Sequence, residues 1–190
     1  MFAGLLKHIS KYVSLTAEEE LIVAEYFKPE TVNKKQYLLS EGENCSTQYF
    51  VTKGCLRMFF IKENGSEHIV QFGIDNWWLA DYMSMDTRQP SGFYIQAVEK
   101  SELLSLSVAN QEKLLELVPK LERYFMRVMQ KGFGAFQMRI RYLFDMTSEE
   151  QYNLFVDRFP GFVQRVPQYM LASYLGVTPE FLSKVRGKRR

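Results

Sequence analysis

A change in hydrophobic periodicity near Ser107 is the feature that most constrains the fold. Between Thr31 and Ser107, short apolar runs are separated by turn residues, and after Ser107 apolar residues recur every three or four positions. The first pattern is typical of strands and the second of amphipathic helices. The sequence therefore predicts an α+β protein in which a β domain precedes a helical part.

The β domain is expected to consist of several short strands. The Asn64-Gly65 pair lies between two apolar runs and indicates a hairpin. Strands at this spacing favour a closed or double-sheet domain. Before them, Thr16–Glu19 reads as a capping box for a short helix that Pro29 stops. The apolar runs are Tyr37–Leu39, Gln48–Thr52, Cys55–Ile61, His68–Phe72, Phe93–Val98 and Leu103–Leu106.

A long helix is predicted after a shorter one at Val108–Val118. It spans residues 119–146, and its apolar positions form one continuous stripe. Such a stripe can pack on its own domain, or it can pair with a second copy of the chain, and Gly132 would permit a close approach. We predict pairing. The predicted dimer seam consists of Leu121, Phe125, Val128, Gly132 and Phe136.

The segment from Pro167 to the end has the pattern of two helices joined by a tight turn. Ala172 is small where the second helix must approach, and Gly176 can adopt a positive φ at the bend. Thr178 and Pro179 are an N-cap and first residue for the second helix. Apolar spacing predicts that Leu171, Leu175, Leu182 and Val185 are buried.

Charge favours DNA as the partner of this helical pair. The last 30 residues carry a net charge of +5, against −3 for the rest of the chain. Lys184 can donate to guanine and Glu180 can accept from cytosine, whereas the basic tail suits phosphates. The alternative is a hairpin whose polar face is merely solvated. The predicted DNA-binding residues are Gln168, Thr178, Pro179, Glu180, Ser183, Lys184, Arg186, Lys188, Arg189 and Arg190.

Composition argues against several other classes of protein. Two cysteines and two histidines do not suffice for a zinc, iron–sulfur or multi-histidine site, so no metal is expected. His68 has no nucleophile at a motif spacing, so no enzyme is predicted. We find neither a signal peptide nor an apolar run of the roughly 20 residues that a membrane span needs. We therefore expect a cytoplasmic protein without membrane contact.

The order of these parts resembles the CRP/FNR family of bacterial transcription regulators. The resemblance covers nearly the whole chain, and Ala172–Val177 with Leu182-Ser183 are its most specific carriers. In the β part the carriers are Gly42, Tyr49–Val51, Gly54–Arg57 and Gly65. The resemblance implies an N-terminal antiparallel β-roll of the jelly-roll type, and a homodimer that binds a two-fold symmetric double-stranded DNA site. RNA polymerase is a further candidate partner.

The resemblance also implies three domains. A cyclic-nucleotide-binding-like sensor would cover residues 1–118, the long dimerisation helix and hinge would cover 119–146, and a helix-turn-helix domain would cover 147–190. Many relatives continue into a wing, which is expected to be short or absent here because the sequence stops at Arg190.

One departure from the family concerns the effector. Members that bind cyclic nucleotides hold ribose and phosphate with a Gly-Glu pair and an Arg-Ser pair, where this chain has Ala80-Asp81 and Ser91-Gly92. Serine cannot neutralise a phosphate as arginine does. We therefore predict that cyclic AMP is not the effector and that no cofactor is bound, although another small molecule remains open. The candidate effector pocket comprises Phe72, Trp78, Ala80, Asp81, Arg88, Ser91 and Gly92. The alternative function is a small-molecule-binding β-roll without sequence-specific DNA binding.

Overall fold

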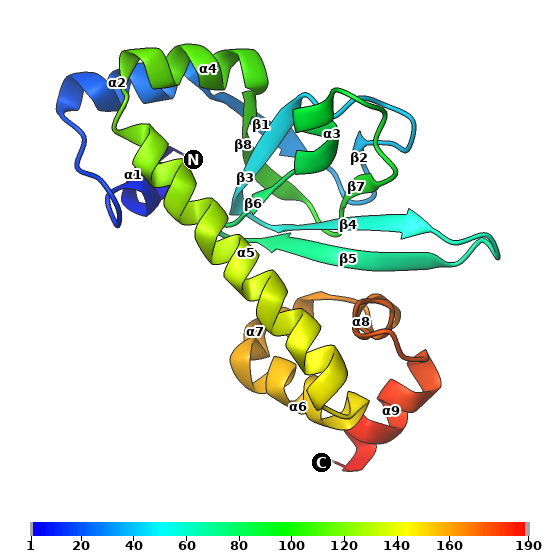
Figure 1. Cartoon of the computed structure of the whole chain (residues 1–190). Helices are drawn as coiled ribbons and strands as arrows, with labels where there is room; N and C mark the ends of the chain where they lie inside the picture. The colour runs from blue at the N-terminus through cyan, green and yellow to red at the C-terminus, as the bar shows by residue number, and fades with distance from the viewer. Residues whose placement is uncertain (1, 189–190) are drawn as a thin grey trace. The chain divides into compact units, whose positions relative to one another are not determined.

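A computed structural model describes residues 2–188 and confirms the α+β class, with a β-roll followed by helices (Figure 1). The chain divides into two compact units. Unit 1 comprises Met1–Phe60 and Val70–Met129, and unit 2 comprises Ile61–Ile69 and Gln130–Arg190. The tip of one hairpin thus groups with the C-terminal helices. The three domain boundaries inferred from the sequence stay a prediction.

Two four-stranded antiparallel sheets form the β-roll. The strand order is β1-β8-β3-β6 in one sheet and β2-β7-β4-β5 in the other. Every predicted apolar run coincides with a strand. The strands are β1 (Lys28–Val32), β2 (Tyr37–Leu39), β3 (Thr47–Lys53), β4 (Cys55–Ile61), β5 (Glu67–Ile74), β6 (Trp78–Leu79), β7 (Tyr94–Ala97) and β8 (Ser101–Ser107).

Burial on both faces explains why the runs in β3 and β8 are continuously apolar. Phe50 and Leu104 point to a core beneath the helices, whereas Val51 and Leu103 point to the core between the sheets. Alternation in a strand sends neighbouring side chains to opposite faces, so both sets must be apolar here.

Helices cover the outer face of the first sheet. Helix α1 spans Phe2–Ile9, α2 spans Ala17–Tyr26, α4 spans Val108–Leu117, and α5 spans Leu121–Asp145. In Figure 1, α2 and α4 lie side by side above the roll. The predicted capping box is confirmed, because the Thr16 hydroxyl accepts from the Glu19 amide and the Glu19 carboxylate accepts from the Thr16 amide.

Four elements of unit 1 were not predicted, and each has a local reason. Strand β1 contains Pro29, which we had taken as a stop. It is an edge strand, where a missing amide proton is tolerated. Strand β6 has only two residues, and helix α3 (Tyr82–Thr87) depends on Asp81 as its cap. Helix α1 is fixed by tertiary packing of Leu5 and Ile9.

Unit 2 contains the predicted helical pair and two further helices. These are α6 (Ser148–Arg158), α7 (Pro160–Arg165), α8 (Gln168–Leu175) and α9 (Pro179–Lys188). Pro160 begins α7, since proline suits a first helical turn. Their core is Tyr152, Leu171, Ala172, Leu182 and Val185, with Leu175 and Val177 partly buried against it.

Among residues 2–188, no helix combines the length and the apolar character that a bilayer crossing requires.

Candidate functional site

The turn between α8 and α9 has the geometry that the sequence predicts. Gly176 ends α8 at φ 71°, in the left-handed region, and its amide bonds the carbonyls of Ala172 and Ser173. The Thr178 hydroxyl then accepts from the Phe181 amide at 3.2 Å, which caps α9 before Pro179. The helix-turn-helix is therefore confirmed as a local structure.

The outer face of α9 is polar and open to solvent. Leu182 and Val185 turn inward at 1% and 2% exposure, so the residues between them face outward. A helix with one buried apolar side and one exposed basic side suits a major groove. The exposed members of the predicted DNA-binding set are Thr178, Pro179, Glu180, Ser183, Lys184, Arg186 and Lys188.

Two members of that set are placed differently from the prediction. Lys188 forms an ion pair with Glu149 of α6, with Nζ and Oε2 2.9 Å apart. Gln168 is half-buried, and its Nε2 is buried without a hydrogen-bond partner among residues 2–188. The contact of Gln168 with DNA stays a prediction. Arg189 and Arg190 lie outside the described residues.

The last turn of α8 makes contacts that sequence reasoning missed. Arg139 of α5 donates from Nη2 to the Tyr174 carbonyl at 2.8 Å, and its guanidinium lies 4.0 Å from the centre of the Tyr174 ring. The Ser173 hydroxyl donates to the Glu67 carbonyl at 2.8 Å and accepts from the Ile69 amide at 3.0 Å. All five residues belong to unit 2. No sequence pattern marks these long-range pairs.

The predicted dimer seam on α5 needs correction at its start. Leu121 is 1% exposed in the core of unit 1, and Phe125 and Val128 pack against the same core. The sequence stripe could not reveal that the chain's own elements cover these positions. Gly132 and Phe136 are exposed, as a seam requires.

A neighbouring stripe of apolar side chains on α5, which shares Phe136 with the predicted seam, is exposed. Its members repeat at steps of three and four, the spacing of a coiled-coil face. We call this set the α5 stripe: Met126, Met129, Phe133, Phe136, Ile140 and Leu143, with exposed fractions from 44% to 66%.

Asp81 and Ser91 are brought together inside the roll. The Ser91 hydroxyl donates to Asp81 Oδ2 at 2.6 Å, while Asp81 Oδ1 accepts from the amides of Met83 and Ser84. Both side chains are buried, at 5% and 3% exposure. Both oxygens of the Asp81 carboxylate thus accept hydrogen bonds from the protein itself.

The other candidate pocket residues do not all share the buried surroundings of Asp81. Trp78 packs in the core beneath the helices, and its Nε1 donates to the Tyr124 hydroxyl at 2.8 Å. Phe72 and Ala80 are buried, whereas Arg88 and Gly92 are exposed. We had expected one pocket from these seven residues. Trp78 must be removed from it, because its side chain points to the opposite face of the sheet from Leu79.

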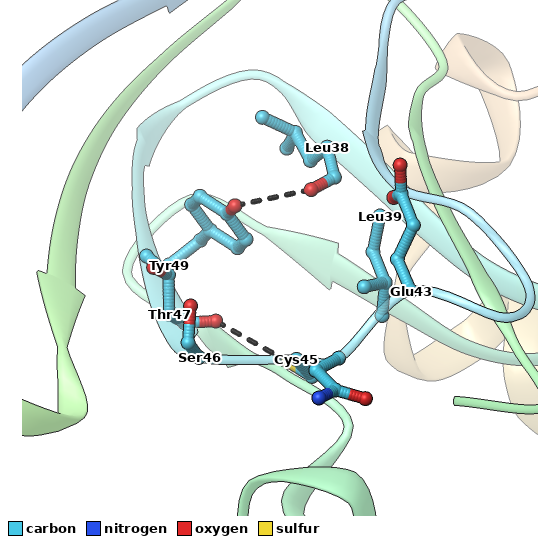
Figure 2. Close-up of a pocket in the computed structure, with 8 residues that line it drawn as sticks. Leu38, Leu39, Glu43, Cys45, Ser46, Thr47 and Tyr49 are labelled. Carbon is cyan, nitrogen blue, oxygen red and sulfur yellow. Dashed lines mark hydrogen bonds between the residues drawn. The ribbon is translucent and has the colours of Figure 1, made fainter. Parts of the chain in front are cut away.

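A cavity of about 310 Å³ opens in the roll at the turn between β2 and β3 (Figure 2). The Tyr49 hydroxyl donates to the Leu38 carbonyl at 3.2 Å, and the Cys45 thiol bonds the Thr47 carbonyl. Burial raises the pKa of both the Cys45 thiol and the Tyr49 hydroxyl. Both groups are therefore neutral at pH 7. The lining residues are Leu38, Leu39, Glu43, Asn44, Cys45, Ser46, Thr47 and Tyr49, none of them predicted.

Metal ligands are not clustered in the part of the chain that the structure describes. Across residues 2–188 there is no group of three or more His, Cys, Asp or Glu side chains that could hold an ion.

Comparison with known proteins identifies the domain and several relatives. Residues 29–117 match the cyclic nucleotide-binding domain. The chain is 26% identical to the anaerobic regulatory protein of Aggregatibacter actinomycetemcomitans, covering 83% of this chain and 65% of that protein. It is 26% identical to the transcriptional activator protein anr of Pseudomonas aeruginosa, covering 91% and 75%. The chain thus spans slightly less than two thirds of the Aggregatibacter protein's length.

Solved structures share the fold at lower identity. FixK2 from Bradyrhizobium japonicum superimposes with a TM-score of 0.73 at 14% identity, covering 85% of this chain and 83% of that chain. A CooA mutant from Carboxydothermus hydrogenoformans gives a TM-score of 0.72 at 14% identity, covering 96% and 83%. The named relatives are regulators and not enzymes, as expected. The chain thus contains a cyclic nucleotide-binding domain, and its relatives and the order of its elements make it similar to transcription regulators of the CRP/FNR type.

Proposed function

We propose that the protein is a homodimeric transcription regulator that reads a two-fold symmetric operator through α9. One observation carries the proposal. The second helix of a capped helix-turn-helix presents Ser183, Lys184 and Arg186 to solvent, while Leu182 and Val185 anchor it from behind. Lys184 is proposed to contact a base edge and Arg186 a phosphate.

The α5 stripe supports the dimer. Six large apolar side chains exposed along one helix are unusual in a monomer and mark an interaction site. Their spacing fits a parallel or antiparallel helix pair, so a second copy of α5 is the proposed partner. A dimer also duplicates α9, which a symmetric operator requires.

We further propose that cyclic AMP is not the effector. The resemblance aligns Asp81 and Ser91 with residues that hold the sugar and phosphate in related domains, and here these two buried side chains bond each other. Neither residue carries a positive charge for a phosphate. A different small molecule in the cavity of Figure 2 is the remaining candidate for a ligand. The proposed location is cytoplasmic, and RNA polymerase stays a candidate partner.

Selection of bound sequences from random DNA tests the proposal. We expect a selected site with two inverted halves. Gel shifts on that site should lose affinity steeply between 50 and 200 mM salt, by roughly 10³-fold if several phosphates are contacted. Lys184→Ala should reduce the preference for the selected site, and Arg186→Ala should weaken selected and scrambled DNA alike. Without enrichment of any sequence, the alternative function as a ligand-binding roll would be favoured.

A further inference from the structure

The last turn of α8 is where two segments distant in sequence attach to the helix-turn-helix. Arg139 comes from α5, and Glu67 and Ile69 come from the β4–β5 hairpin tip. This turn ends at Leu175, and the chain bends toward α9 at the next residue, Gly176. Any rotation of the turn is therefore passed directly to the proposed reading helix.

Arg139 holds the turn with a geometry that lysine cannot reproduce. Its planar guanidinium both donates to the Tyr174 carbonyl and lies over the Tyr174 ring. The Tyr174 ring also packs against Phe155 of α6, with centroids 5.6 Å apart. A cation at the C-terminal end of a helix is favoured by the helix dipole as well. The ring is thus fixed from two sides.

Ser173 attaches the same turn to the hairpin backbone. Its single hydroxyl acts as donor to Glu67 and as acceptor from Ile69, so it joins the edge of β5 as a neighbouring strand would. Ile69 is fully buried, and its amide would lose this partner if the hydroxyl were removed. The hairpin continues by chain connection into strands of the β-roll.

We infer that Arg139 and Ser173 are positioning residues that set the angle of α9 and thereby the selectivity for DNA sequence. Neither side chain belongs to the proposed base-reading set. This inference rests on the proposed function, because selectivity has meaning only if α9 reads DNA. It adds that α5 and the β4–β5 hairpin both affect how α9 reads DNA, through their contacts with the last turn of α8.

The test separates the geometry of each contact from its charge. Arg139→Met removes the contact, and Arg141→Met is its control, because Arg141 lies on the same helix and pairs only locally with Asp145. Arg139→Lys keeps the charge but not the planar group. Ser173→Ala removes both hydrogen bonds, and Ser173→Thr retains a hydroxyl. Each full-length variant is measured by gel shift on selected and on scrambled DNA at one salt concentration.

We expect Arg139→Met, Arg139→Lys and Ser173→Ala to lower the ratio of selected to scrambled affinity about tenfold, roughly the effect of one mismatched base pair. Scrambled affinity should stay constant, and Arg141→Met and Ser173→Thr should keep the ratio. Equal loss on both DNAs for Arg139→Met, or full recovery with lysine, would assign Arg139 a charge role and overturn the inference. An unchanged ratio for both Arg139→Met and Ser173→Ala would overturn it too.

Hydrogen exchange gives a readout that needs no DNA. Arg139→Met and Ser173→Ala should speed exchange at the amides of Gly176 and Val177 without changing the strands of unit 1. If the unmodified protein prefers no DNA sequence, the proposed function fails. Hydrogen exchange then decides separately whether Arg139 and Ser173 order the turn. Unchanged exchange at Gly176 and Val177 in both variants would reject that positioning role.

Discussion

The buried hydrogen bonds of a few side chains determine whether Asp81 is open to a ligand. Asp81 caps α3 with one carboxylate oxygen and accepts from Ser91 with the other. Ser84 is satisfied in the same way, accepting from the Cys45 amide and donating to the Gln89 carbonyl. A ligand that used Asp81 would have to replace a buried hydrogen bond to a carboxylate, worth about 1.5–3 kcal/mol. That competition is the residue-level reason to look for an effector elsewhere.

His68 provides a pH-dependent prediction at the same scale. Burial lowers the pKa of His68 below its usual value of 6.5, and the positive charges of Lys62 and Arg139 lower it further. The unfolded chain therefore binds a proton at a higher pH than the folded chain does. The contribution of His68 to the free energy of unfolding should be fully present above pH 6.5 and should decrease as the pH falls below it.

His68→Gln removes this titration while keeping a polar side chain. Thermal melts at pH 7.5 and pH 5.5 should show a larger decrease in Tm for the unmodified protein than for His68→Gln. The other histidine, His8, is present in both proteins and cancels in the comparison. An equal decrease in both proteins would show that the charge environment of His68 is not linked to folding.

At the scale of elements, two glycines with positive φ predict different mutational costs. Gly176 has φ 71°, and a Cβ there would meet no atom within 4 Å. Gly54 has φ 118°, and its Cβ would lie 2.7 Å from the backbone Cα of Ser101. Gly176→Ala should therefore cost only the backbone strain, about 1–2 kcal/mol, and Gly54→Ala should cost distinctly more.

Chemical denaturation of both alanine variants measures this difference. Gly54→Ala should move the unfolding midpoint of the β-roll further than Gly176→Ala moves that of the C-terminal helices. Gly42→Ala is a control in the roll, since its φ is 86° with open space around it. If Gly54→Ala behaves like Gly42→Ala, the close approach to Ser101 does not determine the cost.

Local signals explain which elements could be predicted from the sequence. The Thr16 capping box, Gly176 and Thr178 act within a few residues, so their patterns are visible without coordinates. Strand β1 and the α8 contacts depend on partners more than 30 residues away, such as Ser105 for Lys28 and Glu67 for Ser173. Such pairing leaves no periodic trace. The candidate site was therefore predictable on α9 and not behind α8.

For the whole molecule, the decisive question is which face of α5 meets a second copy. One face is used within unit 1, where Leu121 and Tyr124 are buried among the other helices. The α5 stripe remains, and its half-exposed rings, methionines and aliphatic side chains form an apolar surface about five turns long. The sequence predicted pairing through α5 but assigned the seam to the face that begins at Leu121.

Two methionines on α5 separate these possibilities. Met129 lies in the α5 stripe and is 44% exposed, and Met138 lies outside the stripe and is 39% exposed. Met129→Glu would place two carboxylates in an apolar seam, where unpaired charges are strongly unfavourable, and should convert the dimer to a monomer. Met138→Glu should leave the dimer intact. Sedimentation velocity gives both masses directly.

Dimers with both variants would remove the stripe from the interface, and a monomer with both would show that any added charge on α5 suffices. Because a symmetric operator needs two copies of α9, the Met129→Glu monomer should also lose preference for the full inverted site while keeping its weak affinity for a single half.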